Sequence, residues 1–184
     1  MKRLTHSHLQ AHRHQRGVTT VEFALVAIPF FLLLLGCIEF GRLMFLWNTV
    51  QEVTRSAARQ AVVTDFNDTA AMNRIKRSAI FRTDAGTLPA APEVSDLVVN
   101  IKYLQSDGVT PVSAMPLDPG ANVSECLDAQ STVCIKFVEV NVCTGNPCAA
   151  VAFEPMMGLF SYLGVLTIPV STVRMPAESL GFTP

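Results

Sequence analysis

An apolar segment near the N-terminus reads Gly17-Val-Thr-Thr-Val-Glu22-Phe23-Ala-Leu-Val-Ala-Ile-Pro-Phe-Phe-Leu-Leu-Leu-Leu-Gly-Cys-Ile38. The sixteen residues from Phe23 to Ile38 contain no charge, and in a helix they would cover about 24 Å. A hydrocarbon core is roughly 30 Å thick, so a helix that crosses it must begin nearer to Gly17. The segment therefore predicts a transmembrane helix, with Glu22 inside the membrane or at its edge.

The charges before this segment predict its orientation. Basic residues and no acidic residue precede it: Lys2, Arg3, Arg13 and Arg16. Cytoplasmic flanks of membrane helices are enriched in Lys and Arg, so we expect the N-terminus in the cytoplasm and the chain after about residue 43 outside. The net charge of -1 excludes the strongly basic character typical of nucleic-acid-binding proteins.

The helix should continue beyond the membrane. Apolar residues recur there at steps of three or four: Phe40, Met44, Trp47, Val50, Val53, Ala57 and Ala61. No Pro or Gly interrupts residues 43–65, so we predict one helix over about 19–64. A second amphipathic helix should run from Ala70 to about Arg82, with Asp68 or Thr69 as its N-cap.

The remaining sequence changes to the two-residue period of β-strands. The predicted elements are a linker over 86–92, strands over 97–104, 133–142 and 165–174, an irregular loop over 111–122 and a short helix over 155–163. Lys136 and Glu139 are expected on the polar side of the second strand, and Pro169 suits an edge position or a bulge in the third. The fold class is α+β, a long N-terminal helix with a small, largely antiparallel β-sheet domain.

These boundaries divide the chain into four expected segments. They are a basic cytoplasmic leader over 1–17, a transmembrane helix over 18–42, an extracytoplasmic helical extension with the second helix over 43–85, and an extracytoplasmic α+β domain over 86–184. A chain of 184 residues has room for one modest domain beside its anchor.

The last segment contains an even number of cysteines: Cys126, Cys134, Cys143 and Cys148. An extracytoplasmic compartment permits disulfides, and three pairings are possible. Sequence order favours Cys126 with Cys134 and Cys143 with Cys148, which close short loops, while a crossed arrangement stays open. A zinc site would prefer Cys-x2-Cys pairs and often His, neither of which occurs in this segment, so we expect no metal.

The N-terminal residues resemble a known processing and assembly signal. Gly17, followed five residues later by Glu22 and then an apolar helix, resembles the signal of type IV prepilins. The stretch from Arg16 to Val26 is similar to that of TadE-like pseudopilins of the tight-adherence (Flp) pilus system. Glu39-Phe-Gly-Arg42 and Thr54-Arg-Ser-Ala-Ala-Arg-Gln-Ala61 also look like the helix continuation of that family. The resemblance is strong over 13–64 and weak over the outer domain.

The resemblance implies a pseudopilin or minor pilin that acts in pilus assembly and is not an enzyme. A prepilin peptidase would cut between Gly17 and Val18. Glu22 and Phe23 would contact a neighbouring subunit, and Glu22 would pair with its N-terminal amine. The protein would be a single-pass protein of the bacterial inner membrane with a periplasmic C-terminal domain. Its partners would be the membrane, the peptidase, other pilin or pseudopilin subunits and the assembly platform, and we expect no cofactor, small-molecule substrate or nucleic acid.

Physical arguments that do not depend on the family also explain the residues of this motif. Gly17 has no Cβ that would obstruct a protease. A cut there would leave an amine on Val18, about one helical turn from Glu22, and a carboxylate in a membrane is tolerated chiefly beside such a cation. Glu39 and Arg42 are three residues apart and can form an ion pair at the membrane edge, or contact another helix.

Two alternatives stay open. Leu34-Leu-Gly-Cys37 roughly resembles a lipobox, which would make the chain a lipoprotein acylated at Cys37, although Glu22 would interrupt its hydrophobic region. The chain could also be a membrane-anchored binding module or enzyme that uses the helix only as a signal anchor. The sequence contains no Cys-x-x-Cys pair, glycine-rich phosphate loop or Gly-x-Ser-x-Gly motif that would favour an enzyme.

Overall fold

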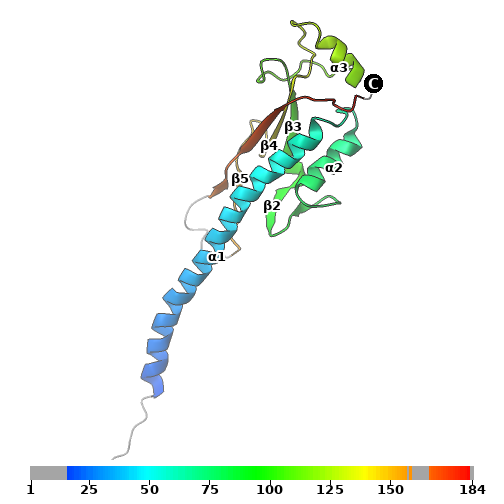
Figure 1. The fold of residues 1–184 in the computed structure, drawn as a ribbon. Helices are drawn as coiled ribbons and strands as arrows, with labels where there is room; N and C mark the ends of the chain where they lie inside the picture. Colours follow the sequence, from blue (N-terminus) through cyan, green and yellow to red (C-terminus); the bar gives the residue numbers. More distant parts are fainter. Residues whose placement is uncertain (1–15, 157, 159–165, 183–184) are drawn as a thin grey trace, which may run out of the picture. The chain divides into compact units, whose positions relative to one another are not determined.

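The computed structural model describes residues 16–156, 158 and 166–182 (Figure 1). These residues form two compact units that divide between Phe40 and Gly41. We call them the N-terminal unit and the outer unit. Most of the predicted leader, residues 1–15, lies outside the described residues.

The longest element is helix α1, Arg16–Ala61, which confirms the single helix predicted over about 19–64. Its last turn tightens after Ala61, where the amides of Val63 and Thr64 donate to the carbonyls of Gln60 and Ala61. Among the described residues α1 is also the one helix that, by length and composition, could cross a membrane.

The part of α1 that belongs to the outer unit buries one face in the core. The buried side chains recur at steps of three and four: Leu43, Leu46, Val50, Val53, Ala57 and Ala61. The predicted stripe is therefore right from Val50 onward and wrong before it, because Met44 and Trp47 are 39% and 37% exposed. The predicted stripe takes two successive steps of three from Met44 through Trp47 to Val50, which turn its direction around the helix axis by about 120°. From Leu43 to Ala57 the observed stripe alternates steps of three and four, and each such pair of steps turns it by only about 20°.

Helix α2, Thr69–Ala79, confirms the predicted second helix. Asp68 is its N-cap and accepts a hydrogen bond from the amide of Ala71 at 2.8 Å. The helix ends before the predicted Arg82 because Phe81 takes a positive φ of 60°. Helix α2 lies beside the second half of α1 (Figure 1), and the two are joined where Ser78 donates to the Gln60 side chain at 3.2 Å.

A three-stranded antiparallel sheet forms the centre of the outer unit. Its strands are β3 (Val99–Leu104), β4 (Phe137–Val142) and β7 (Ser171–Pro176), in the order β3-β4-β7. Val138, Val140 and Val142 of the central strand are buried in the core. Glu139 was expected on a polar side, yet it is only 8% exposed. It lies opposite Arg174 in the register of β4 and β7, and the two form an ion pair.

Among the described residues, two small hairpins and two short helices complete the unit. They are β1 (Thr87–Leu88) with β2 (Ala91–Ser95), β5 (Val151–Ala152) with β6 (Thr167–Ile168), η1 (Asp96–Val98) and α3 (Pro119–Glu125). The linker predicted over 86–92 is wrong, because Ala90 adopts a φ of 62° and turns the chain back into a strand pair.

Two further predictions need correction. The strand predicted over 165–174 is two strands in different sheets, because Pro169 has no amide to donate and separates β6 from β7. The loop predicted over 111–122 contains the start of α3, where Asp118 accepts from the Ala121 amide at 2.7 Å. The helix predicted over 155–163 falls mostly outside the described residues.

Candidate functional site

The predicted processing and assembly residues lie at the start of α1. Gly17 and Val18 belong to the first helical turn. Glu22 is exposed one turn later, and the neighbouring Phe23 side chain is 73% exposed. The predicted cleavage and contact residues therefore lie on consecutive turns of one helix.

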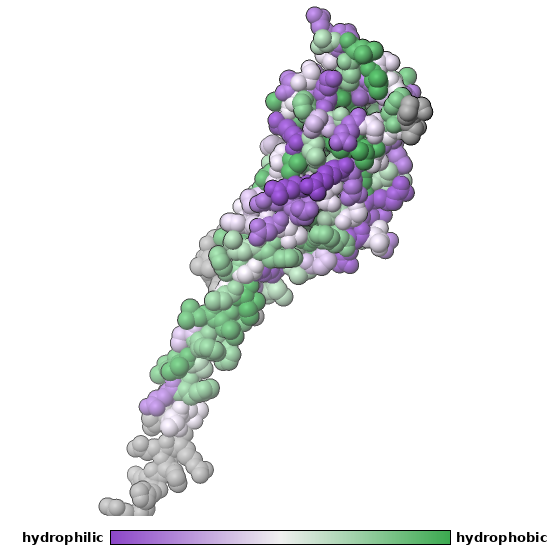
Figure 2. Space-filling model, viewed as in Figure 1, coloured by the Kyte–Doolittle hydropathy of each residue, from purple (hydrophilic) through white to green (hydrophobic). Residues whose placement is uncertain are grey.

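The N-terminal unit presents an apolar surface around these residues. Its large apolar side chains are exposed: Val21, Phe23, Leu25, Val26, Ile28, Phe30, Phe31, Leu32, Leu33, Leu34, Ile38 and Phe40. Figure 2 shows hydrophobic residues along much of this part of α1. From Thr19 to Ile38 the sequence has a single charged residue, Glu22. A carboxylate within an apolar surface is costly in a membrane.

A shallow apolar groove runs along one face of this unit. Its lining consists of Thr20, Phe23, Ala24, Ala27, Ile28, Phe31, Leu32 and Leu35. The small side chains of Ala24 and Ala27 lie between the larger rings of Phe23 and Phe31 along the helix. Small residues allow the backbones of two membrane helices to approach closely. This face, which includes the predicted contact residue Phe23, is suited to packing against another helix.

Arg42 connects three segments of the outer unit. Its guanidinium donates to the carbonyl oxygens of Ala90 at 3.1 Å and Glu154 at 2.8 Å, and forms an ion pair with the Glu93 carboxylate. The same guanidinium lies 4.7 Å from the centre of the Phe153 ring. The Glu93 side chain is 1% exposed, so this ion pair is buried. Sequence reasoning missed these partners because they lie 48 to 112 residues away from Arg42.

Glu39, the predicted ion-pair partner of Arg42, belongs to the N-terminal unit. Its side chain is only 8% exposed. The ion pair at the membrane edge stays a prediction. In the structure Arg42 also attaches the β1–β2 hairpin and the chain after β5 to helix α1.

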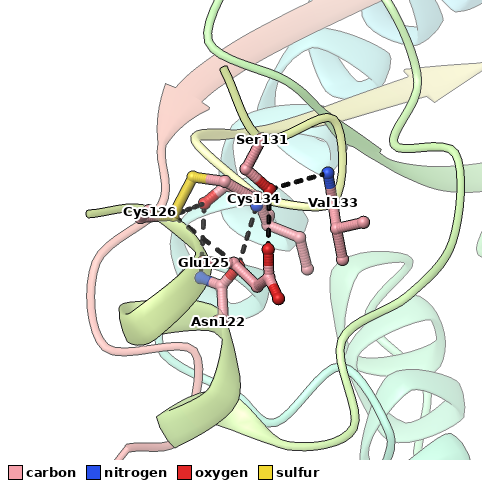
Figure 3. Close-up of a disulfide and its surroundings, with 7 residues drawn as sticks. Asn122, Glu125, Cys126, Ser131, Val133 and Cys134 are labelled. Carbon is pink, nitrogen blue, oxygen red and sulfur yellow. Dashed lines mark hydrogen bonds between the residues drawn. A yellow bond between two sulfur atoms is a disulfide. The ribbon is translucent and has the colours of Figure 1, made fainter. Parts of the chain in front are cut away.

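The first disulfide joins Cys126, at the end of α3, to Cys134, with Cα atoms 4.9 Å apart. Figure 3 shows the polar side chains that surround it. Asn122 accepts from the amide of Ile135 at 2.8 Å and donates to its carbonyl oxygen at 3.4 Å. The Asn122 side chain is 7% exposed, so these bonds satisfy polar groups in a buried place. Together they attach α3 to the chain that leads into β4.

The second disulfide joins Cys143 to Cys148 across a turn, with Cα atoms 5.3 Å apart. Next to it, Thr144 and Ala149 exchange two backbone hydrogen bonds of 2.9 and 2.8 Å. The pairing is thus the one with short loops, and Cys37 is an exposed free thiol. Within the described residues there is no cluster of His, Cys, Asp or Glu side chains that could hold a metal.

Two groups of the outer unit have shifted pKa values, and both shifts have structural causes. Burial raises the pKa of Tyr103 to about 12, and the negative charge of Asp65 adds to the effect. The Tyr103 hydroxyl lies 3.5 Å from the sulfur of Met72. The hydroxyl of Thr110, together with the amides of the turn, lowers the pKa of Asp107. These groups serve packing and a turn.

Comparison with known proteins finds a similarity over most of α1. Residues 17–59 match the family model described as TadE-like protein, so the match begins at Gly17 and ends just before the end of α1. No curated protein and no solved structure matches the chain significantly. The TadE-like family is pilus-related and structural in kind, and it implies membrane and pilin-subunit partners. Residues 17–59 of this chain are therefore similar to the TadE-like family, which confirms the resemblance predicted from their sequence.

Proposed function

We propose that this chain is a membrane-anchored pseudopilin or minor pilin that acts in the assembly of a tight-adherence (Flp) pilus. A prepilin peptidase removes residues 1–17, so the mature chain starts at Val18. The membrane helix over 18–42 crosses the bacterial inner membrane once, and residues 43–85 and 86–184 lie in the periplasm. Other pilin or pseudopilin subunits and the assembly platform are its partners.

The observation that carries this proposal is the position of Glu22. It is the single charge between Thr19 and Ile38, it is exposed on a helix whose large apolar side chains are also exposed, and the family match starts five residues before it. A helix used only as a signal anchor has no need for a carboxylate at this depth, where it is costly.

The helix geometry suits a contact between subunits. Val18 and Glu22 are four residues apart, which is about 6 Å along a helix. When two such helices pack side by side and are offset by about this distance, the new amine of one chain lies level with the Glu22 carboxylate of the other. The charge pair would fix the offset between neighbouring subunits, and the exposed Phe23 ring would pack in the same interface.

The two disulfides support a periplasmic outer unit, because disulfides persist in oxidising compartments. This proposal orients the chain with its TadE-like helix entering the membrane from the cytoplasmic side. It also leaves the outer unit available for contacts at the membrane surface.

The first test is mass spectrometry of the mature N-terminus. We expect a chain that starts at Val18, with or without a methylated amine. The G17L variant places a branched side chain at the cut and should keep residues 1–17. An intact leader in the wild type, or a chain that starts at an acylated Cys37, would contradict the proposed processing.

The second test separates assembly from anchoring. E22A should insert into the membrane normally while pilus assembly falls below detection, and E22D should retain part of the assembly because it keeps the charge. E52Q is the matched control, since Glu52 is an exposed glutamate further along the same helix. Normal assembly in E22A would favour the alternative in which the helix is only a signal anchor.

A further inference from the structure

The outer unit exposes apolar side chains at the end where it begins. Met44, Phe45 and Trp47 of α1 are exposed, although they lie next to the buried Leu43 and Leu46. Beyond α1, two more exposed apolar side chains belong to the connection between β5 and β6, and a third lies between β6 and β7. We define these six residues as the apolar rim: Met44, Phe45, Trp47, Met156, Leu166 and Val170.

The contacts of the rim place its members at the same end of the outer unit. Trp47 and Val170 line one groove. Met156 and Arg42 line a second depression. The carbonyl oxygen of Leu166 accepts from the amide of Phe153 at 2.9 Å, and the ring of Phe153 lies under the Arg42 guanidinium. The rim is thus built from two regions more than 100 residues apart in the sequence.

We propose that the apolar rim binds the lipid bilayer at the boundary between its headgroups and acyl chains. This inference rests on the membrane anchoring in the proposed function. In the proposed function the membrane helix ends at residue 42, so Met44, Phe45 and Trp47 follow within about one and a half turns of its outer end. This is the headgroup level, where Trp is enriched because its ring is apolar and its N–H is polar.

The order of side chains along α1 favours lipid over a protein partner. Met44 and Phe45 are apolar, Trp47 is amphipathic, and Gln51 and Arg55 line the same groove as Trp47 one and two turns further on. This order follows the change from hydrocarbon to headgroups to water across a bilayer surface. Arg can extend its charged group towards lipid phosphates while its stem remains in apolar surroundings.

The sequence of the second region agrees with the same partner. The connection from β5 to β6, residues 153–166, has one charged residue near its start, Glu154, and none over 155–166. Met156, within this connection, is 77% exposed. Contact between the rim and the bilayer would hold the outer unit against the membrane surface. It would therefore limit the orientations in which the outer unit can contact neighbouring subunits.

The test uses the intrinsic fluorescence of Trp47, which is the only tryptophan of the chain. The full chain is reconstituted into vesicles of phosphatidylcholine and phosphatidylglycerol, with and without lipids brominated near the headgroup end of their acyl chains. We expect emission at shorter wavelength than for tryptophan in water, and about a twofold loss of intensity with the brominated lipids, because the ring lies at the interface. Unchanged intensity with brominated lipids would overturn the proposal.

A second reporter tests the part of the rim that is distant in sequence. The W47F/M156W variant moves the tryptophan to Met156, and W47F/L127W moves it to Leu127, which is 85% exposed and lies near Ala177 and Glu178, beyond the far end of β7. We expect quenching by brominated lipids at position 156 and none at 127. Equal quenching at both positions, or none at 156, would overturn the proposal, and circular dichroism checks that the variants fold.

Vesicle flotation distinguishes failure of this inference from failure of the proposed function. A chain that floats with vesicles while neither rim reporter is quenched is anchored but has no rim contact with lipid. A chain that does not float lacks the membrane anchor itself, which overturns both proposals. Protection of Trp47 from acrylamide without quenching by brominated lipids would show a protein covering the rim, and this also overturns the lipid assignment.

Discussion

The two parts of α1 differ in what covers their apolar residues. From Thr19 to Phe40 most of the large apolar side chains are exposed, whereas from Leu43 to Ala61 one face is buried in the core of the outer unit. The difference follows from the rest of the chain. The strands and α2 supply a partner for the second part, and the first part is suited to a membrane and to other helices.

The charged residues differ in the same way between the two regions. In the outer unit, Arg42 and Glu93 form a buried pair, and Glu139 has Arg174 across two strands. In the N-terminal unit, Glu22 is exposed within an apolar surface. Internal pairing stabilises the outer unit, so we expect substitutions there to change its free energy of unfolding. Substitutions in the exposed part of α1 should instead change contacts with other molecules.

The strongest test of this difference is R42M. It removes the cation from the buried Glu93 carboxylate and the donor groups from two backbone carbonyls. We expect the free energy of unfolding of the outer unit to fall by about 3 to 5 kcal/mol, because a buried charge would be left unpaired. Urea denaturation in detergent micelles, followed by far-UV circular dichroism, measures this value.

The double variant R42M/E93Q is the control for R42M. It removes the unpaired carboxylate as well, so it should recover part of the lost stability. A loss below about 1 kcal/mol in R42M would mean that the pair contributes little, as surface ion pairs do. The conclusion that Arg42 attaches the β1–β2 hairpin to α1 would then be wrong.

A matched pair of leucines compares the two parts of α1 directly. Leu46 is fully buried and Leu33 is 72% exposed. L46A should cost the outer unit about 2 to 5 kcal/mol, because it removes buried methyl groups and leaves a cavity. L33A should change the same free energy of unfolding by less than about 0.5 kcal/mol. Similar losses in both variants, measured by urea denaturation, would contradict the division of the helix.

The cysteines provide the next comparison. Replacing Cys126 and Cys134 with alanine removes a cross-link between residues eight apart in the sequence. Constraint of such a loop in the unfolded chain is worth about 2.5 kcal/mol, so the variant should lose stability of this order. C37S should leave the unfolding transition unchanged, since Cys37 is an exposed free thiol. The thermal midpoint of each variant, measured without reductant, gives the result.

Sequence reasoning succeeded where the structure depends on neighbouring residues. The period of three to four residues predicts both helices, and Asp68 marks the start of the second. The candidate assembly residues Gly17 and Glu22 also lie within one short segment, which is why a motif of adjacent residues could indicate them.

It failed where the structure depends on distant residues. The partners of Arg42 come from the β1–β2 hairpin and the chain after β5, and no local pattern links them to it. Glu139 looks like a surface residue until β7 brings Arg174 opposite it. The prediction that Met44 and Trp47 belong to the buried stripe of α1 was wrong for a related reason. Only the packed core decides which of two possible helix faces is buried.

The smallest expected effect concerns a single hydroxyl in the outer unit. Burial raises the pKa of Tyr103 to about 12 from its ordinary value of 10.0, so the folded protein retains this proton longer than the unfolded chain as the pH rises. Stability should therefore be unaffected below about pH 10 and decrease from there to about pH 12. At pH 11, one unit above the pKa of the unfolded chain, this loss of stability is about 1.4 kcal/mol.

The Y103F variant removes the titrating group while keeping the ring that packs edge-on against Phe66, with ring centres 6.0 Å apart. At pH 8 its free energy of unfolding should lie within about 0.5 kcal/mol of the wild type, because the hydroxyl donates to the sulfur of Met72, which is a weak acceptor. At pH 11 the variant should be the more stable of the two, since ionisation of the unfolded chain at this position no longer favours unfolding. Parallel urea titrations at the two pH values measure this crossover. Equal losses in both proteins on going to pH 11 would show that the Tyr103 hydroxyl titrates alike in the folded and unfolded chain.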